Sequence, residues 1–323
     1  MVSIGNITTG GTGKTPAAIY FSRLLATEGH RVGILSRGYG GSMVKEGGVL
    51  SDGEDLLLSP AQGGDEPYLL AVNLPGIQVA VGRKRFDMGR ALQERYGNDL
   101  FVLDDGFQHY ALARDVDIVL VDATNPFGNG QLLPHGILRE PISALERADI
   151  VILTKCDLAD SMALADLQGH LEKASGRETI FRSRHAPTGL VKLPIEYNFK
   201  NVAKKPAKTS LFDHEEVWAL SAIGNHRAFE KTLLELGASK VESITYRDHH
   251  DYSERDVEAI LKRVSPYQFL ITTEKDWIRL KKYKDEFAHL KNFYYLKIEF
   301  EIMSNEVLLK EGLKAKLLSG KQS

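Results

Sequence analysis

The sequence TTGGTGKTP at residues 8–16 constrains the fold of this chain more than any other segment. It follows a short apolar run at residues 2–5 and leads into a helical pattern that extends to residue 28. Its three glycines let the backbone turn N–H groups inward around an anion, where side chains would obstruct the turn. The helix that follows adds its unpaired N–H groups and the positive end of its dipole. The spacing therefore predicts a phosphate-binding loop, and an ordinary glycine-rich turn is the weaker alternative.

The residues of this loop have roles that follow from their positions. The ammonium group of Lys14 is expected to reach terminal phosphate oxygens, and the hydroxyl of Thr15 is expected to ligate Mg²⁺. One departure from the usual pattern is Thr8, which stands where the first glycine is normally found. The predicted nucleotide-binding residues are Thr8, Thr9, Gly10, Gly11, Thr12, Gly13, Lys14 and Thr15.

A second element of a nucleoside triphosphate site follows the apolar run at residues 100–103. A buried strand that ends in a carboxylate typically holds Mg²⁺ directly or through water, so Asp104 is a predicted metal ligand. Asp105 and His109 lie in the turn that follows, DDGFQH. Their residue types leave a site role and an ordinary turn role both open, because carboxylates in turns and histidines on surfaces are common.

Charged residues at other predicted element ends extend the candidate site. Arg83, Lys84 and Arg85 follow a strand predicted at residues 77–81. Open α/β sheets bind ligands at that end of their strands, so phosphate binding and a solvated helix start both fit this basic cluster. Asp65 precedes a helical run, and its residue type alone favours an N-cap over a catalytic role.

The order of the predicted elements indicates the fold class. Buried-strand runs alternate with helical patterns in the first half of the chain, which predicts a parallel, doubly wound α/β sheet of the P-loop NTPase type. Prolines and lysines scattered through residues 185–213 predict a connection between domains. A second βα series follows. The predicted organisation is a nucleotide-binding domain at residues 1–184, a linker at 185–213 and a smaller α/β domain at 214–323.

Composition limits the possible classes of function. At 323 residues the chain is long enough for two domains. Its net charge of −2 provides no electrostatic basis for nucleic-acid binding. The single cysteine, Cys156, excludes an internal disulfide and a cysteine-rich metal site, which fits a reducing compartment. No apolar run approaches the ~20 residues that span a bilayer, so a cytoplasmic protein is expected, with peripheral membrane contact left open.

Two further motifs leave alternatives open. Residues 154–157, TKCD, are similar to the element with which GTPases bind guanine, so a regulatory GTPase or a metallochaperone-like NTPase is an alternative function. Residues 248–251, DHHD, contain enough carboxylate and imidazole groups to suggest a metal site. A loop of this kind between a strand and a helix more often caps the helix, and capping is the expected role.

Taken together, these segments resemble the tetraacyldisaccharide 4'-kinase family, the lipid A 4'-kinases. The matching segments occur in the family's order and cover nearly the whole chain: GNITTGGTGKT, ILSRGYGG, GDEPYLLA, LDDGFQH, LLPHGILREP, the turn at residues 221–225, DHHDYS and TTEKD. The family's phosphate loop also lacks the first glycine, which accounts for Thr8. The resemblance implies ATP- and Mg²⁺-dependent phosphorylation of the 4'-hydroxyl of a tetraacyldisaccharide 1-phosphate, which gives lipid IVA in lipid A biosynthesis.

The resemblance also implies a set of catalytic residues. Asp65 corresponds to the catalytic base and His249 to the group that orients and tunes it, with Lys14 and Arg139 beside them. A carboxylate near a sugar hydroxyl can accept its proton, while Mg²⁺, lysine and arginine balance the charge on the phosphates. A pair recruited from two domains would complete the site when substrate binding closes the cleft.

The remaining correspondences concern binding. Asp104 and Asp105 correspond to the paired carboxylates of the metal and nucleotide site, and His109 corresponds to the histidine that closes that motif. Arg85 and Arg139 correspond to positive residues that are expected to contact the substrate. Together with the phosphate loop, these residues are expected to hold ATP, Mg²⁺ and the acylated disaccharide.

The chain departs from the family at its beginning. Members usually carry an amphipathic helix before the first strand, and no such helix precedes residue 2 here. The implied partner surface is the cytoplasmic face of the inner membrane, and attachment to it is expected to be weakened. The GTPase alternative gives no role to Asp65 or to the DHHDYS loop. A non-catalytic lipid-binding module is disfavoured because Lys14, Thr15 and Asp104 are intact.

Overall fold

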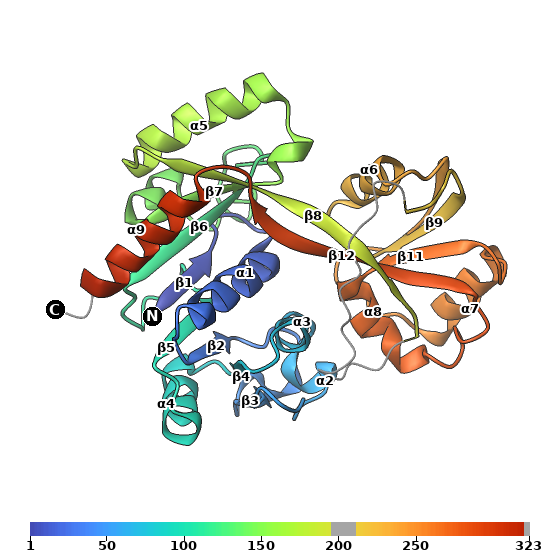
Figure 1. Cartoon of the computed structure of the whole chain (residues 1–323), viewed down its shortest axis with the longest axis horizontal. Helices are drawn as coiled ribbons and strands as arrows, with labels where there is room; N and C mark the ends of the chain where they lie inside the picture. The colour runs from blue at the N-terminus through green and yellow to red at the C-terminus, as the bar shows by residue number, and fades with distance from the viewer. Residues whose placement is uncertain (195–210, 320–323) are drawn as a thin grey trace. The chain divides into compact units, whose positions relative to one another are not determined.

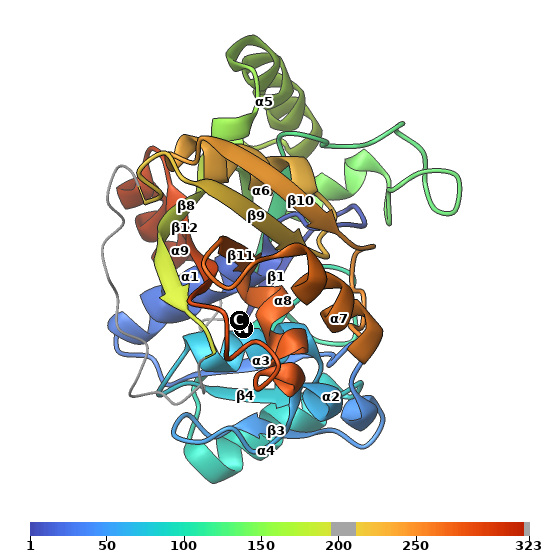
Figure 2. The ribbon, with the colours of Figure 1, turned by 90° about the vertical axis from the view of Figure 1, so that its right-hand side faces the viewer.

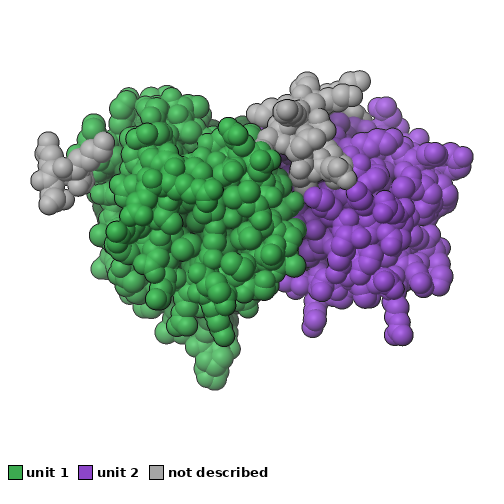
Figure 3. Space-filling model, turned by 90° about the horizontal axis from the view of Figure 1, so that it is seen from below, with its two compact units in different colours: residues 1–185, 300–323 green, residues 186–299 purple. Residues whose placement is uncertain are grey.

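The computed structural model describes residues 1–194 and 211–319 and divides into two compact units. Unit 1 comprises residues 1–185 and 300–323, and unit 2 comprises residues 186–299 (Figures 1 and 3). Both units combine parallel strands with helices. The predicted α/β class, with a second and smaller α/β part, is confirmed.

Unit 1 is organised around its first strand, β1 (Val2–Gly5), which lies between β5 (Leu100–Asp104) and β6 (Val116–Asp122) and runs parallel to both. The strand order is β8-β7-β6-β1-β5-β2-β4-β3, and the short edge strand β3 is antiparallel to β4. The other strands are β2 (Val32–Ser36), β3 (Gly48–Ser51), β4 (Gln78–Val81), β7 (Ile150–Thr154) and β8 (Ile180–Lys192). A first strand of four residues is therefore long enough to occupy the centre of the sheet.

Helices cover the strands of unit 1. Every residue of β1, β2 and β7 is buried, as expected for parallel strands with helices on both faces. Leu164, Leu167 and Leu171 of α5 join the apolar cluster over β6 and β7. The helices are α1 (Lys14–Thr27), α2 (Pro60–Gly63), α3 (Asp65–Asn73), α4 (Arg85–Tyr96), α5 (Ser161–Ser175) and α9 (Glu306–Ser319), with 3₁₀ turns at Ser42–Val44, Ile142–Arg147 and Cys156–Leu158.

Unit 2 repeats the pattern on a smaller scale. Strand β11 (Phe269–Thr273) lies between β9 (Glu216–Ser221) and β12 (Asn292–Ile302), with β10 (Lys240–Thr245) on the other side of β9, and all of these pairs are parallel (Figure 2). The helices are α6 (His226–Glu235), α7 (Glu254–Arg263) and α8 (Glu274–Leu280), followed by a 3₁₀ turn at Lys281–Tyr283. Its core is rich in aromatic side chains, among them the fully buried Trp277 and Phe293.

Strands β8 and β12 each pass from one unit into the other, at residues 185–186 and 299–300. Residues 185–192, predicted to belong to the linker, form the second half of β8. Residues 195–210 of the predicted linker lie outside the described residues. Helix α9 belongs to unit 1, where the Tyr20 hydroxyl donates to Glu306 at 2.7 Å. Of the helices in the described ranges, none combines the length and apolar character needed to cross a bilayer.

Candidate active site

The phosphate loop joins the end of β1 to the start of α1, as the sequence predicts. Gly10 and Gly13 have φ angles of 103° and 88°, in the region that favours glycine, and Gly13 is the N-cap of α1. The Nζ atom of Lys14 lies 3.3 Å from Oδ1 of Asn6 and 3.5 Å from Oδ1 of Asp105. The loop lysine is therefore directed toward the carboxyl end of β5.

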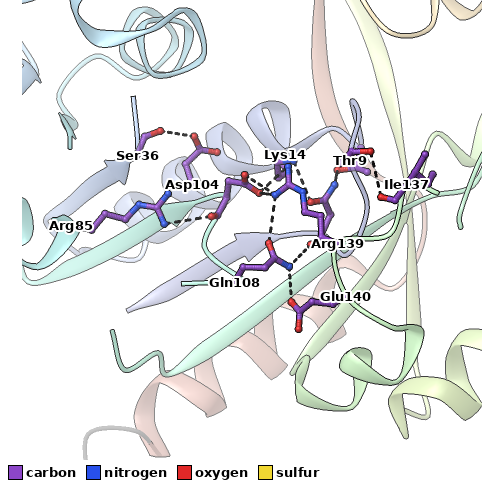
Figure 4. A network of polar contacts seen from close by, with 12 residues as sticks. Thr9, Lys14, Ser36, Arg85, Asp104, Gln108, Ile137, Arg139 and Glu140 are labelled. Carbon is purple, nitrogen blue, oxygen red and sulfur yellow. Dashed lines mark hydrogen bonds and ion pairs between the residues drawn. The ribbon is translucent and has the colours of Figure 1, made fainter. Parts of the chain in front are cut away.

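A second loop, at residues 132–141, pairs with the chain just before the phosphate loop. The backbone N–H of Thr9 donates to the carbonyl of Ile137 at 2.7 Å, and that of Arg139 donates to the carbonyl of Ile7 at 2.8 Å. These two bonds bring Arg139 beside the phosphate loop although more than a hundred residues separate them (Figure 4).

Asp105 contacts two cations, Arg139 and Lys14. Nη1 of Arg139 lies 2.9 Å from both of its carboxylate oxygens, and Lys14 approaches from the other loop. Its φ of 50° is uncommon for a residue with a side chain. Burial alone would raise the pKa of Asp105, but Lys14 and Arg139 hold that pKa below its ordinary value. Asp105 is thus an ionised carboxylate between two cations.

Asp104, the last residue of β5, has the opposite environment. It is 4% exposed, and Oγ of Ser36, at the end of β2, donates to its Oδ2 at 2.9 Å. Burial, with the nearby carboxylates of Glu66 and Asp105, raises the pKa of Asp104 to about 6, although Ser36 and Lys14 oppose the rise. Among the described residues, Ser36 is the only hydrogen-bond donor to this carboxylate.

The predicted basic cluster divides into two environments. Arg85 is 5% exposed, and its Nη1 donates to the backbone carbonyl of Asp105 at 3.4 Å. Burial lowers the pKa of Arg85, while Asp104 and Asp105 counter this effect. Arg83 and Lys84 are exposed to solvent. Only one member of the cluster therefore belongs to the network around the paired carboxylates.

His109 lies one turn beyond the paired carboxylates. Burial, then the charges of Arg85, Arg114 and Arg37, lower the pKa of His109, so its ring is neutral near pH 7. The guanidinium of Arg114 donates to the backbone carbonyl of His109 at 2.7 Å and fixes the turn. The structure therefore brings His109 to the same sheet edge as the predicted site residues.

Four polar side chains contact this network without having been predicted from the sequence: Asn6, Ser36, Gln108 and Glu140. The charge of Glu66, also not predicted, acts on the pKa of Asp104. Gln108 Nε2, for example, donates to Glu140 at 2.8 Å, and its Oε1 lies 3.5 Å from Nη1 of Arg139. Most of them are close neighbours of predicted site residues in the chain. That adjacency is the only signal in the sequence, and it is weak because polar residues are common in any turn.

The first residue of α3 is Asp65, and its N-cap is Gly64, so the prediction that Asp65 caps the helix is wrong. Gly64 has a φ of 91°, and a Cβ there would lie 2.7 Å from the carbonyl oxygen of Tyr39, so only glycine fits the cap position. Asp65 and Glu66 both lie in the first turn, where the helix dipole favours negative charge.

His249 belongs to unit 2, in the loop between β10 and α7. Its φ is 59°, Nδ1 lies 3.0 Å from Nη2 of Arg279, and Nε2 lies 3.0 Å from Nζ of Lys275. A neutral imidazole has one lone-pair nitrogen, so only one of these cations can donate to the ring at a time. Asp65 lies in unit 1, and the Asp65–His249 pair stays a prediction.

The DHHD segment precedes the cap of α7. Nε2 of His250 lies 3.1 Å from Asp256, which forms a capping box with Ser253 at the start of α7. No group of three or more His, Cys, Asp or Glu side chains suited to a metal occurs in the described ranges. The N-cap of α7 is Ser253, two residues beyond DHHD, and His250 supports the cap through its contact with Asp256.

The residues at the ends of β1 and β5 suit a magnesium–nucleotide complex. Mg²⁺ prefers oxygen ligands, and it usually binds one or two protein groups together with phosphates and water. Asp104 has a buried carboxylate with a single described donor, and Thr15 adds a hydroxyl in the first turn of α1. The donor set therefore fits Mg²⁺ bound jointly by the protein and a nucleotide.

Comparison with known proteins agrees with this site. The family model described as tetraacyldisaccharide-1-P 4'-kinase matches residues 1–318. Proteins named tetraacyldisaccharide 4'-kinase from Anaeromyxobacter sp. (strain Fw109-5) and Desulfatibacillum aliphaticivorans are 41% and 40% identical. Those two alignments each cover 99% of this chain, and they cover 83% and 84% of the relatives.

A solved structure is also similar over nearly the whole chain. It is LpxK from Aquifex aeolicus in complex with ATP, with a TM-score of 0.71 and 30% sequence identity. The match covers 98% of this chain and 87% of that one. Since the family model spans almost every residue and relatives that are about 40% identical align over 99% of this chain, the chain belongs to the tetraacyldisaccharide 4'-kinase family.

Proposed function

We propose that this protein transfers the γ-phosphoryl group of ATP to the 4'-hydroxyl of a tetraacyldisaccharide 1-phosphate. The observation that carries the proposal is the convergence of Lys14, Asp104, Asp105 and Arg139 at one edge of the unit 1 sheet. Phosphoryl transfer needs mainly positioning and neutralisation of charge, and this network supplies two cations and two carboxylates in fixed positions. Family membership identifies the acceptor class.

Each group has a distinct part in this proposal. The phosphate loop and Lys14 would bind the ATP phosphates, and Thr15 with Asp104 would hold Mg²⁺, which would neutralise charge on the phosphates. Asp105 holds the guanidinium of Arg139 beside Lys14, so that both cations face the transferred group. Asp65 accepts the proton of the sugar hydroxyl, and His249 orients the Asp65 carboxylate.

The acyl chains of such a substrate lie in a bilayer, so we place the working enzyme at the cytoplasmic surface of the inner membrane. Arg83 and Lys84 are exposed, and the neighbouring Phe86 is 64% exposed at the start of α4. Basic and aromatic side chains together favour anionic lipid surfaces. Replacing Phe86 with Ser and Lys84 with Ser should weaken co-flotation with anionic vesicles, and unchanged flotation would contradict this placement.

The transfer itself is tested with radiolabelled ATP and monophosphorylated acyl-disaccharide in detergent micelles. Lys14→Met should lower the rate of transfer by ~10²-fold or more, because it removes a charge that stabilises the transition state. Lys173→Met is the matched control, since Lys173 is exposed in the last turn of α5 and far along the chain from the network. Normal transfer by Lys14→Met would refute the proposed site.

A further inference from the structure

Two backbone carbonyls of the phosphate loop accept hydrogen bonds from side chains at the carboxyl end of β7. Oγ1 of Thr154 donates to the carbonyl of Thr12 at 3.0 Å, and Nζ of Lys155 donates to the carbonyl of Gly11 at 2.8 Å. Thr154 is fully buried, and the Lys155 side chain is 11% exposed. These contacts tie the loop to a strand that supplies none of the groups proposed above to bind or react.

Lys155 is arranged to bind the protein rather than phosphate. It forms an ion pair with Asp122 at the end of β6, so its charge is already balanced. Its φ of 57° is uncommon for a residue with a side chain, and such backbone persists where the surroundings determine it strongly. The Asp122 pair and the Gly11 carbonyl together provide that determination.

Peptide geometry relates these contacts to phosphate binding. In a trans peptide the C=O and the following N–H point in opposite directions. Holding the Thr12 carbonyl outward therefore aims the N–H of Gly13, the N-cap of α1, to the opposite side, where unpaired helix N–H groups bind anions. Holding the Gly11 carbonyl fixes the peptide unit that it shares with the N–H of Thr12, and this N–H donates to the Gly10 carbonyl at 3.1 Å and closes the turn.

Gly13 is also confined by His185 of β8. A Cβ at Gly13 would lie 2.5 Å from Nε2 of His185, so the backbone of Gly13 packs directly against the ring. That nitrogen is buried and has no hydrogen-bond partner among the described residues. The N-cap of α1 therefore has a hydrogen-bonded peptide preceding it and an imidazole packed against its Cα.

We propose that Thr154 and Lys155 are positioning residues for ATP binding, which hold the Gly11 and Thr12 carbonyls so that the loop has its phosphate-binding shape before the nucleotide arrives. The inference rests on the proposed ATP site. It adds a determinant of nucleotide affinity at the carboxyl end of β7, outside the phosphate loop and the paired carboxylates. Pre-formed loops bind more tightly because less conformational entropy is lost on binding.

The test measures the dissociation constant of ATP in the presence of Mg²⁺ and the absence of lipid. Thr154→Val keeps the shape of the side chain but removes the donor, and should raise the dissociation constant roughly tenfold. Thr154→Ser keeps the donor and should bind ATP like the native protein. The KM for ATP should follow the dissociation constant, with kcat nearly unchanged.

The matched control is Thr272→Val in unit 2. Thr272 is also a fully buried threonine near the end of a strand, and its Oγ1 donates to the carbonyl of Leu220 at 2.9 Å. This variant should lower thermal stability about as much as Thr154→Val but leave ATP affinity unchanged. Equal loss of affinity in both variants, or native affinity in Thr154→Val, would overturn the proposal.

A second arm addresses Lys155 without leaving a buried charge unpaired. The double variant Lys155→Met, Asp122→Asn should also raise the dissociation constant of ATP, and native affinity would exclude a role for Lys155. Lys14→Met separates this inference from the proposed site. If Lys14→Met binds ATP normally, the site itself is wrong; if Lys14→Met fails to bind while Thr154→Val binds normally, only the inference is wrong.

Discussion

Each unit contains a buried aspartate near a strand end, and the two carboxylates differ in the number of hydrogen-bond donors around them. Asp276 of unit 2 is 0% exposed, and it accepts from the hydroxyl of Thr273 at 2.7 Å, from the backbone N–H of Ala222 at 3.1 Å and from Tyr252 at 3.3 Å. Asp104 of unit 1 is nearly as buried, yet Ser36 is its single described donor. Burial raises the pKa of both carboxyls.

The difference separates a structural carboxylate from one that is suited to a ligand. Three donors around Asp276 partly offset the cost of its burial, so this carboxylate is suited to a structural role without any ligand. Asp104 lacks such compensation and is therefore suited to a cation that arrives with the nucleotide. The following experiments test this distinction, from the largest expected effect to the smallest.

Replacing each aspartate with asparagine should affect catalysis very differently. Asp104→Asn should lower phosphate transfer by ~10²-fold or more, because a charged contact to the metal is lost. Asp276→Asn should retain activity within roughly tenfold at temperatures where it is folded, because we assign Asp276 a structural role. Steady-state rates with micellar substrate measure both variants, and near-native activity in Asp104→Asn would remove it from the metal site.

The proposed Asp65–His249 pair links the two units in function. If the residues act as one unit, the variant with both replaced by Ala should be little slower than the slower single variant. A double-mutant cycle on kcat measures this directly. Losses that multiply would show that the two residues act independently.

Stability without ligands should change in opposite directions in the two asparagine variants. Because the pKa of Asp104 is raised in the folded protein, its carboxyl contributes favourably to the free energy of unfolding below pH 3.8. This contribution is lost as pH rises through about 6. Asp104→Asn should therefore stabilise the Mg²⁺-free and ATP-free protein at pH 7.5, by at most about 3 kcal/mol for two pKa units. Asp276→Asn should destabilise it by about 1–3 kcal/mol, because donors in unit 2 lose their acceptor.

Urea titrations at pH 7.5 and pH 4 check these signs. The stability difference between native protein and Asp104→Asn should shrink at pH 4, where the native carboxyl is protonated in the folded state. A difference that persists unchanged at pH 4 would attribute it to packing rather than charge.

The smallest expected effect concerns His185, behind the phosphate loop. Burial and the charge of Lys155 lower the pKa of His185 to about 4, although Asp122 opposes them. Its contribution to stability is therefore complete above pH 6.5 and is lost as pH falls toward 4. His185→Gln should reduce the loss of unfolding free energy at acid pH, by about 1 kcal/mol at pH 5.5. Parallel stability curves for His185→Gln and the native protein between pH 7 and 5 would contradict it.

The sequence by itself determined the parts of the protein that depend on local chemistry. The phosphate loop needs glycines with positive φ, and the parallel strands need apolar residues on both faces, so both are visible in the order of residue types. Asp104 was predicted because it directly follows the apolar run of a buried strand. The family motifs then named Asp65, Arg139 and His249 as site residues.

Only the tertiary structure decided which side chains meet. Arg139 reaches Asp105 because residues 137–139 pair with residues 7–9, and a long-range backbone pairing leaves no local pattern in the sequence. The opposite pKa directions of Asp104 and Asp105 come from the different burial and partners of two adjacent carboxylates. Likewise, the return of α9 to unit 1 depends on contacts with residues almost three hundred positions away, such as Tyr20 with Glu306. Each of these outcomes is set by packing between segments distant in the chain, which residue type alone does not specify.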